Sequence, residues 1–175
     1  MKKQLGILIF LLVLTCAVGG YFLFENSAKA NMSEVDSIVD KQLKAYPNYY
    51  TSSDKFTDTL SLAITAMKYY TIGNYNSALD AFQKFEPLEE DDGYYNLYLG
   101  ICYLKTGYSS LAIRHFDEAL SSFTTFNEKT VVRWYLALAM LKSERINEGR
   151  ELLDEQVKQN TPYKKQAAEI LNQLD

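Results

Sequence analysis

Apolar residues in the middle of the chain recur at helical spacing, and this pattern is itself repeated along the sequence. Residues 59–88 can be laid over residues 93–122 at an offset of 34. The two copies then share a tyrosine (Tyr69 and Tyr103), a glycine (Gly73 and Gly107), an alanine (Ala78 and Ala112) and a phenylalanine (Phe82 and Phe116). A weaker third copy, residues 134–153, follows the second at an offset of 37. A fixed period of this length predicts a stack of similar structural units.

Each unit is predicted to be a pair of antiparallel helices. Small residues stand where the two helices would cross: Ala66, Gly100 and Ala137 on the first helices, and Ala78, Ala112 and Gly149 on the second. Gly73 and Gly107 follow the first helices, and glycine readily takes the left-handed conformation that ends a helix. The sequence therefore predicts a tight turn between the two helices of a pair.

The second copy carries Leu99-Gly100-x-x-Tyr103 and then Ala112 and Phe116, which is most of the pattern of a tetratricopeptide repeat (TPR), whose period is 34. The chain therefore resembles the TPR family. The resemblance implies an all-α, right-handed solenoid of about three helix hairpins, at residues 59–92, 93–126 and 130–160. It also implies binding of a peptide or helix from another protein on the concave face of the first helices.

Helical patterns on both sides extend this array. Residues 161–175 predict a capping helix, which starts at Thr161-Pro162 and keeps the open end of the stack soluble. Residues 31–58 predict an amphipathic helix that ends before Pro47, followed by a tyrosine-rich connector. The connector followed by a repeat array resembles bacterial membrane-anchored TPR proteins.

Residues 1–30 predict an N-terminal signal-anchor or transmembrane helix. Two lysines precede a charge-free run, residues 5–24, which is long enough to cross a hydrocarbon core of about 30 Å. The lysines favour an N-terminus on the inside, so we expect a single-pass protein of the bacterial cytoplasmic membrane with a periplasmic or extracytoplasmic body. Two alternatives stay open: cleavage at Ala28-Lys29-Ala30, and lipidation of Cys16, although the preceding residues fit a lipobox poorly.

The concave positions of the family, transferred to this chain, form an apolar and aromatic groove. The resemblance implies these binding residues: Leu60, Met67, Tyr70, Tyr94, Leu97, Ile101, Leu104, Trp134, Leu138 and Leu141. TPR proteins that clamp a C-terminal carboxylate need Lys, Arg and Asn at such places. Here only Lys105 and Lys142 stand at the margin of the groove, so a carboxylate clamp is not expected.

An apolar groove requires a cover in water, and two covers fit the sequence. In the first, a partner's peptide or amphipathic helix docks with Trp134 and Tyr94 as anchors, and the protein is a scaffold or adaptor held at the membrane. In the second, the chain's own helix fills the groove through Val35, Ile38, Val39 and Leu43. That version is a cleaved, soluble periplasmic domain with a structural or self-associating role.

Charge and chemistry narrow the function classes further. The net charge of −4 and the lack of a basic stripe argue against a nucleic-acid partner. His115 is the only histidine, and Cys16 and Cys102 lie far apart in the sequence, so no paired metal motif exists. The acidic run Glu89–Asp92 lacks the alternating order of a calcium loop, and no phosphate-binding glycine loop occurs. We therefore expect no enzyme, metal, cofactor or small-molecule substrate.

Overall fold

Helices make up most of the chain that the structure describes. The computed structural model describes residue 21 and residues 31–48, 58–84 and 93–174. A helix over residues 31–42 precedes seven more: α2 (Asp58–Thr71), α3 (Tyr75–Phe82), α4 (Gly93–Lys105), α5 (Ser109–Ser122), α6 (Phe126–Lys142), α7 (Ile146–Lys158) and α8 (Lys164–Leu174). These ranges contain no strand. The prediction of an all-α fold is confirmed.

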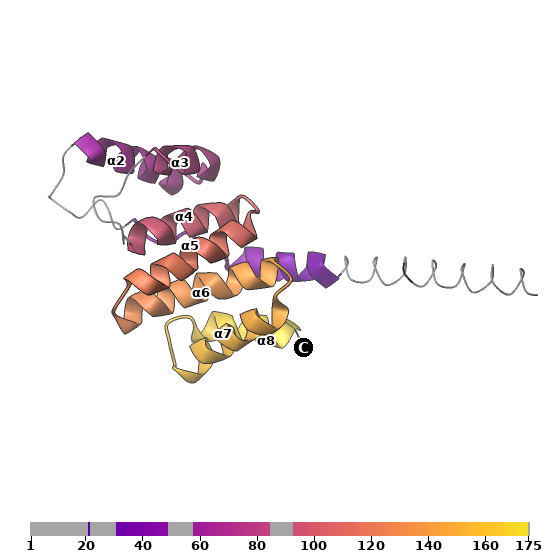
Figure 1. Cartoon of the computed structure of the whole chain (residues 1–175). Helices are drawn as coiled ribbons and strands as arrows, with labels where there is room; N and C mark the ends of the chain where they lie inside the picture. The colour runs from indigo at the N-terminus through magenta and orange to yellow at the C-terminus, as the bar shows by residue number, and fades with distance from the viewer. Residues whose placement is uncertain (1–20, 22–30, 49–57, 85–92, 175) are drawn as a thin grey trace, which may run out of the picture.

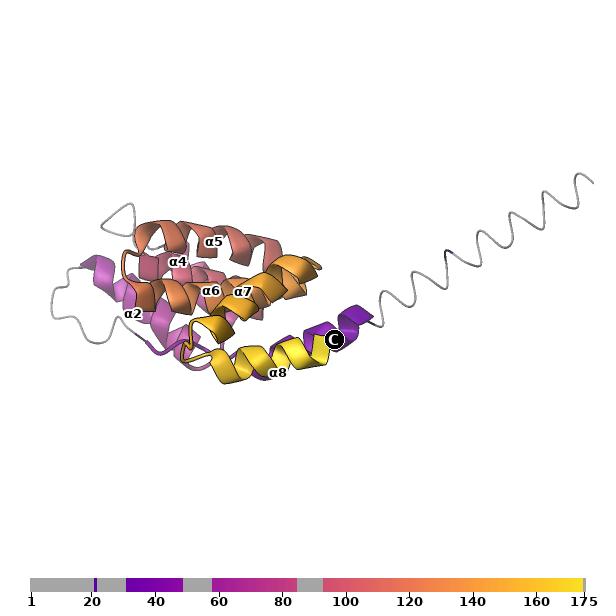
Figure 2. The ribbon, with the colours of Figure 1, turned by 90° about the horizontal axis from the view of Figure 1, so that it is seen from below.

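Three helix hairpins stack in chain order, and α8 follows the last of them (Figure 1). Figure 2 shows α5 in the outer layer, with α4 and α6 beneath it. On the far side of α4 and α6, the helix of residues 31–42 lies alongside α8. The N-terminal helix therefore lies on the side of the stack that faces away from α5, the side of the first helices on which the sequence places the groove.

The turns inside the hairpins share one geometry. After α2, the amide of Asn74 donates to Tyr69 O at 2.9 Å and that of Gly73 to Tyr70 O at 3.0 Å, with Gly73 at φ 79°. The same pair of bonds closes α4 at Gly107 and α6 at Glu144, whose φ values are 87° and 65°. This is the Schellman arrangement, in which one left-handed residue ends the helix. The third hairpin uses the same turn without glycine, which is one reason why its sequence match is weaker.

Close crossings of the two helices within a hairpin explain why small and large residues recur at a fixed spacing along the chain. A Cβ atom at Gly100 would stand 2.4 Å from Cε1 of the Phe116 ring, and one at Gly149 would stand 2.8 Å from Cδ2 of Leu141. Ala78 and Ala112 are fully buried at the corresponding crossings. The residues that the sequence assigned to helix crossings thus serve packing, and they bring α4 close to α5 and α6 close to α7.

The expectation of a single-pass membrane protein is corrected. Among the described residues no helix is long and apolar enough to cross a membrane. The longest of the named helices, α6, has 17 residues, which is about 26 Å at 1.5 Å per residue and short of a hydrocarbon core. The segment on which the expectation rested, residues 5–24, lies outside the described residues except for Tyr21, and so do Cys16 and residues 28–30.

Candidate functional site

Residues 31–48, which we call the N-terminal segment, lie against α2, α4 and α6. The segment consists of a helix over residues 31–42 and an irregular tail over residues 43–48. Ile38, Val39 and Leu43 are 5%, 0% and 4% exposed, and Val35 packs partly buried against the same core. These are the four residues through which the sequence predicted self-coverage. The last helical bond runs from Leu43 N to Val39 O, and Pro47 follows in the tail.

The tail is held by hydrogen bonds to its main chain. The Tyr70 hydroxyl accepts from Tyr46 N at 2.7 Å and donates to Tyr46 O at 3.1 Å. The Tyr98 hydroxyl donates to Pro47 O at 2.6 Å, and the Tyr135 hydroxyl donates to Lys44 O at 2.9 Å. Side chains of three successive first helices thus bind consecutive peptide groups of the tail.

A fifth main-chain contact comes from Lys105, whose ammonium group donates to Leu43 O. Burial lowers the pKa of Lys105, an effect that Asp40 opposes and that Lys142 reinforces. Lys142, with a side chain only 13% exposed, lies 2.7 Å from an Asp40 oxygen and 3.6 Å from an Asp36 oxygen. The groove therefore holds two lysines at one end, and the N-terminal segment brings two carboxylates to them.

Aromatic rings pack together beside these polar contacts. The Tyr70 and Tyr98 rings meet edge to face at 5.2 Å, and Tyr46 of the tail lies 6.2 Å from Tyr98. Burial raises the pKa of the Tyr70 and Tyr135 phenols far above the usual range. Both hydroxyls therefore keep their protons near neutral pH and remain hydrogen-bond donors. Edge-to-face pairs of this kind stabilise a cluster beyond the area that they bury.

In the structure, the predicted groove residues lie in several different environments. Met67, Tyr70, Leu97, Ile101, Leu104, Leu138 and Leu141 are all buried in one continuous core. Trp134 stacks on Tyr163 at 4.9 Å, next to α8. Tyr94 packs on Phe123 at 4.9 Å and donates to Glu128 at 3.3 Å. The side chain of Leu60 lies outside the described residues. Of the ten, only Tyr70 makes a hydrogen bond to the N-terminal segment among those described above.

Sequence reasoning missed Tyr98 and Tyr135 and placed Lys105 and Lys142 only at the margin. A signal for all four exists, since each tyrosine precedes its lysine by two helical turns, on the same face. Tyr98 and Tyr135 are 37 residues apart, as are Lys105 and Lys142, which is the offset between the second and third copies. A search for polar residues that repeat with the hairpins would have found them.

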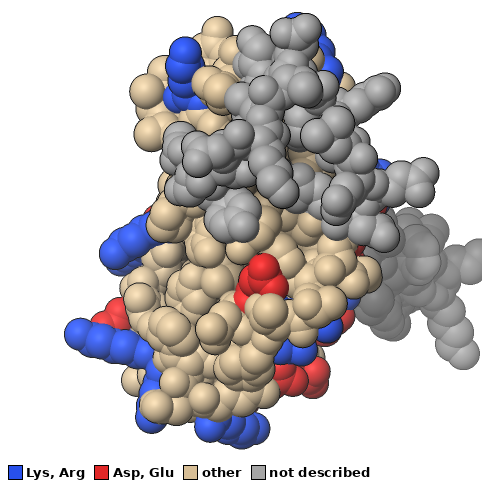
Figure 3. Space-filling model, turned by 90° about the vertical axis from the view of Figure 1, so that its left-hand side faces the viewer, with Lys and Arg blue, Asp and Glu red and all other residues tan. Residues whose placement is uncertain are grey.

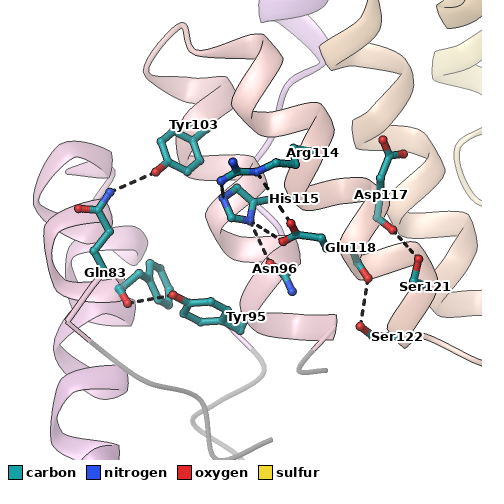
Figure 4. A network of polar contacts seen from close by, with 11 residues as sticks. Gln83, Tyr95, Asn96, Tyr103, Arg114, His115, Asp117, Glu118, Ser121 and Ser122 are labelled. Atoms are coloured by element: carbon teal, nitrogen blue, oxygen red, sulfur yellow. Dashed lines mark hydrogen bonds and ion pairs between the residues drawn. The ribbon is translucent and has the colours of Figure 1, made fainter. Parts of the chain in front are cut away.

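The single histidine belongs to a different contact network, between α4 and α5 (Figure 4). His115 Nδ1 lies 2.9 Å from Asn96 Oδ1 and 3.2 Å from a Glu118 oxygen, and its ring stacks on Tyr103 at 5.3 Å. Burial lowers the His115 pKa, and Glu118 opposes that shift. The Tyr103 hydroxyl accepts from Gln83 Nε2 beyond the end of α3, at 3.1 Å, so the network joins two hairpins.

Other chemistry is sparse in the described part of the chain. No group of three His, Cys, Asp or Glu residues there could hold a metal ion. Burial raises the pKa of the Cys102 thiol, and a buried protonated thiol is a poor nucleophile. Figure 3 shows the side face where α5 ends and α6 begins: its described area is mostly uncharged except for an acidic side chain near the middle, and charged side chains of both signs lie around the rim. The acidic run Glu89–Asp92 lies outside the described residues.

Comparisons with known proteins show a similarity in fold. No protein-family model matches the chain, and no curated protein matches it. One similar solved structure is the Yersinia enterocolitica type III secretion chaperone SycD in complex with a peptide of the translocator YopD. It has a TM-score of 0.55 and 23% sequence identity, and the match covers 70% of this chain and 94% of that one.

A second similar structure is the same chaperone, SycD, in an alternative dimer. Its TM-score is 0.53 at 23% identity, and the match covers 73% of this chain and 93% of that one. At this identity the likeness concerns the fold alone. This chain has a TPR-like helical-repeat fold similar to that of SycD.

Proposed function

We propose that this protein is a non-catalytic adaptor whose concave groove binds a segment of a partner protein. The observation that carries the proposal is the set of groove hydrogen bonds to main-chain atoms of Leu43, Lys44, Tyr46 and Pro47. Main-chain bonds depend on the path of a ligand more than on its side chains. A groove that holds a segment through its main chain is suited to a segment of another protein.

One further observation supports a binding role. The similar structure of SycD is a complex with a peptide of YopD. The Cys102 thiol, with its raised pKa, is a poor nucleophile, which agrees with a non-catalytic role.

Among the groove residues implied by the resemblance, Ile101 and Leu138 have the best placement for this role. Ile101 lies between Tyr98 and Lys105 on α4, one helical turn from each. Leu138 has the same place on α6. The remaining eight, with Tyr94 and Trp134 as proposed anchors, stay predictions; in the present arrangement those two aromatics face other partners.

The proposal is tested by selecting random peptides of about 18 residues on the full chain. A second selection uses the full chain with Asp36→Lys and Asp40→Lys, since these exposed positions would then repel Lys142 and free the groove. Selected peptides are resynthesised with a photoreactive benzophenone, and their attachment points are mapped by mass spectrometry. We expect attachment to α2, α4 and α6.

Two outcomes would contradict the proposal. One is attachment mainly to the outer helices α3, α5 and α7, and the other is that neither chain selects any peptide. A chain with Glu151→Lys and Asp154→Lys on α7 carries the same change in net charge at exposed positions and serves as the control. This control chain should select the same peptides as the unmodified chain.

A further inference from the structure

We infer that the groove is selective for an acidic segment, and that the N-terminal segment is a tethered ligand which such a segment must displace. The inference rests on the proposed function, because it assigns a ligand class and a means of regulation to the same groove. It comes from the charges in the groove and from the way in which residues 31–48 occupy it.

The charges define the first requirement on a ligand. Lys105 and Lys142 both point toward the N-terminal segment, and the Lys142 side chain is 13% exposed while Asp36 and Asp40 are 48% and 61% exposed. The buried partner of each ion pair thus belongs to the groove, and the exposed partner belongs to the ligand. If the segment leaves, two neighbouring ammonium groups lose the carboxylates that compensate them. A replacement ligand must therefore carry negative charge at this end.

The register of the segment defines the second requirement. Asp36 and Asp40 are four residues apart, so they lie one helical turn apart on one side of the helix. Ile38, Val39 and Leu43 form the buried stripe beside them. The tail then presents its main chain to the groove. The matching partner is an amphipathic helix with two carboxylates at this spacing, an adjacent aliphatic stripe, and a non-helical continuation.

The segment is also held in a manner that permits exchange. Only three of its side chains are buried, Ile38, Val39 and Leu43. Among the described residues it is held by hydrogen bonds to its main chain, by the ion pairs of Asp36 and Asp40 with Lys142, by the ring contact of Tyr46 with Tyr98, and by an exposed bond from Gln42 to Glu169. It is tied to α2 only through residues 49–57, and a short tether gives an effective concentration on the order of mM. A partner in solution must outcompete that concentration.

The test uses a synthetic, fluorescently labelled peptide with the sequence of residues 31–48. Its affinity is measured for the unmodified full chain and for the full chain with Asp36→Lys and Asp40→Lys. We expect at least about tenfold tighter binding to the substituted chain, because its own segment is repelled from Lys142. Equal affinities would overturn the idea of a tethered competitor, even if both chains bind peptides in the groove.

Selectivity for acidic ligands is tested with two peptides of equal net charge. A peptide with Asp36→Asn and Asp40→Asn should bind the substituted chain about threefold to tenfold more weakly than the native peptide. A peptide with Glu34→Lys changes the net charge by the same amount at an exposed position and should bind within about twofold of the native one. If the two altered peptides bind equally, the groove does not recognise these carboxylates.

A measurement on the unmodified chain covers the case in which the substituted chain fails to fold. Saturating native peptide should accelerate hydrogen exchange in residues 31–48 and leave α4 protected. Unchanged exchange in residues 31–48 would overturn displacement. A dimer that dissociates when Asp36 and Asp40 are substituted would also overturn the inference, since the segment would then belong to a second copy. Failure of the proposed function is distinct: no peptide then attaches to the groove of either chain.

Discussion

The Tyr98 hydroxyl donates a 2.6 Å hydrogen bond to the carbonyl oxygen of Pro47, a residue 51 positions earlier in the chain. The Tyr135 hydroxyl reaches still further, to Lys44 O at 2.9 Å across 91 positions. These bonds join a segment outside the repeats to the middle of the stack. The position of the tail therefore depends on a few long-range polar contacts, each of which is removable by deleting one oxygen atom.

The first prediction concerns those two hydroxyls. Tyr98→Phe and Tyr135→Phe should each lower the free energy of unfolding by about 0.5–1.5 kcal/mol, because each removes one hydrogen bond and keeps the ring. The double variant should also raise the amide exchange of residues 43–48, measured by mass spectrometry. Tyr108→Phe is the matched control, since that side chain is 58% exposed. Unchanged exchange of the tail in the double variant would show that these bonds do not hold it.

The second prediction concerns the crossing of α4 and α5. Gly100→Ala would place a methyl group 2.4 Å from the Phe116 ring, so the helices must separate or the ring must move. We expect a loss of about 1–3 kcal/mol in the free energy of unfolding, measured by urea denaturation. A second substitution, Phe116→Leu, should cost less in the Gly100→Ala chain than in the unmodified one. Additive costs would mean that the two residues do not conflict.

The repeat scaffold could be predicted from the sequence because it rests on local spacing. Gly73 and Gly107 mark turns through a backbone conformation that other residues adopt with strain, and both have positive φ. Phe82 and Phe116, fully buried, repeat at the period of the hairpins. Such signals survive in a single sequence because each depends on residues that lie within one hairpin.

The contents of the groove were harder to predict because they depend on contacts between distant segments. Val39 and Leu43 belong to an apolar stripe that can be recognised in the sequence. A helix of a partner protein could fill the same groove as the chain's own helix, so the sequence does not decide between the two. Which polar side chains contact the N-terminal segment also depends on how each helix is rotated about its own axis. Tyr135, which the sequence did not single out, follows the predicted groove residue Trp134 by one position, which is about 100° around a helix. Trp134 instead stacks on Tyr163.

The third prediction concerns the turn after α6. Glu144 has φ 65°, the left-handed conformation that glycine provides in the two preceding hairpins. Glu144→Gly should therefore raise the free energy of unfolding by about 0.5–1 kcal/mol, seen as a higher thermal midpoint. Glu144→Ala is the control, because alanine removes the carboxylate and keeps the backbone strain. Equal stabilisation by both substitutions would assign the effect to charge.

The fourth prediction concerns stability at alkaline pH. Burial raises the pKa values of Tyr70 and Tyr135 above the ordinary value of 10.0, so the folded chain retains protons that the unfolded chain releases. The stability contributed by these phenols is therefore complete below pH 10 and is lost as the pH rises above it. Lys105, whose pKa is lowered from 10.5, contributes with the opposite sign below that value, so the measurement begins at pH 10.5.

Between pH 10.5 and 11.5, each of the two buried phenols should lower the free energy of unfolding by up to about 1.4 kcal/mol per pH unit. The free energy of the Tyr135→Phe chain should fall less steeply than that of the unmodified chain, by about the contribution of one phenol. Urea denaturation at several pH values gives the slopes, and Tyr108→Phe should leave the slope unchanged because its ring is exposed. Parallel slopes for Tyr135→Phe and the unmodified chain would mean that Tyr135 ionises while the chain is folded. The hydroxyl would then be accessible to solvent, and its bond to Lys44 would not persist in solution.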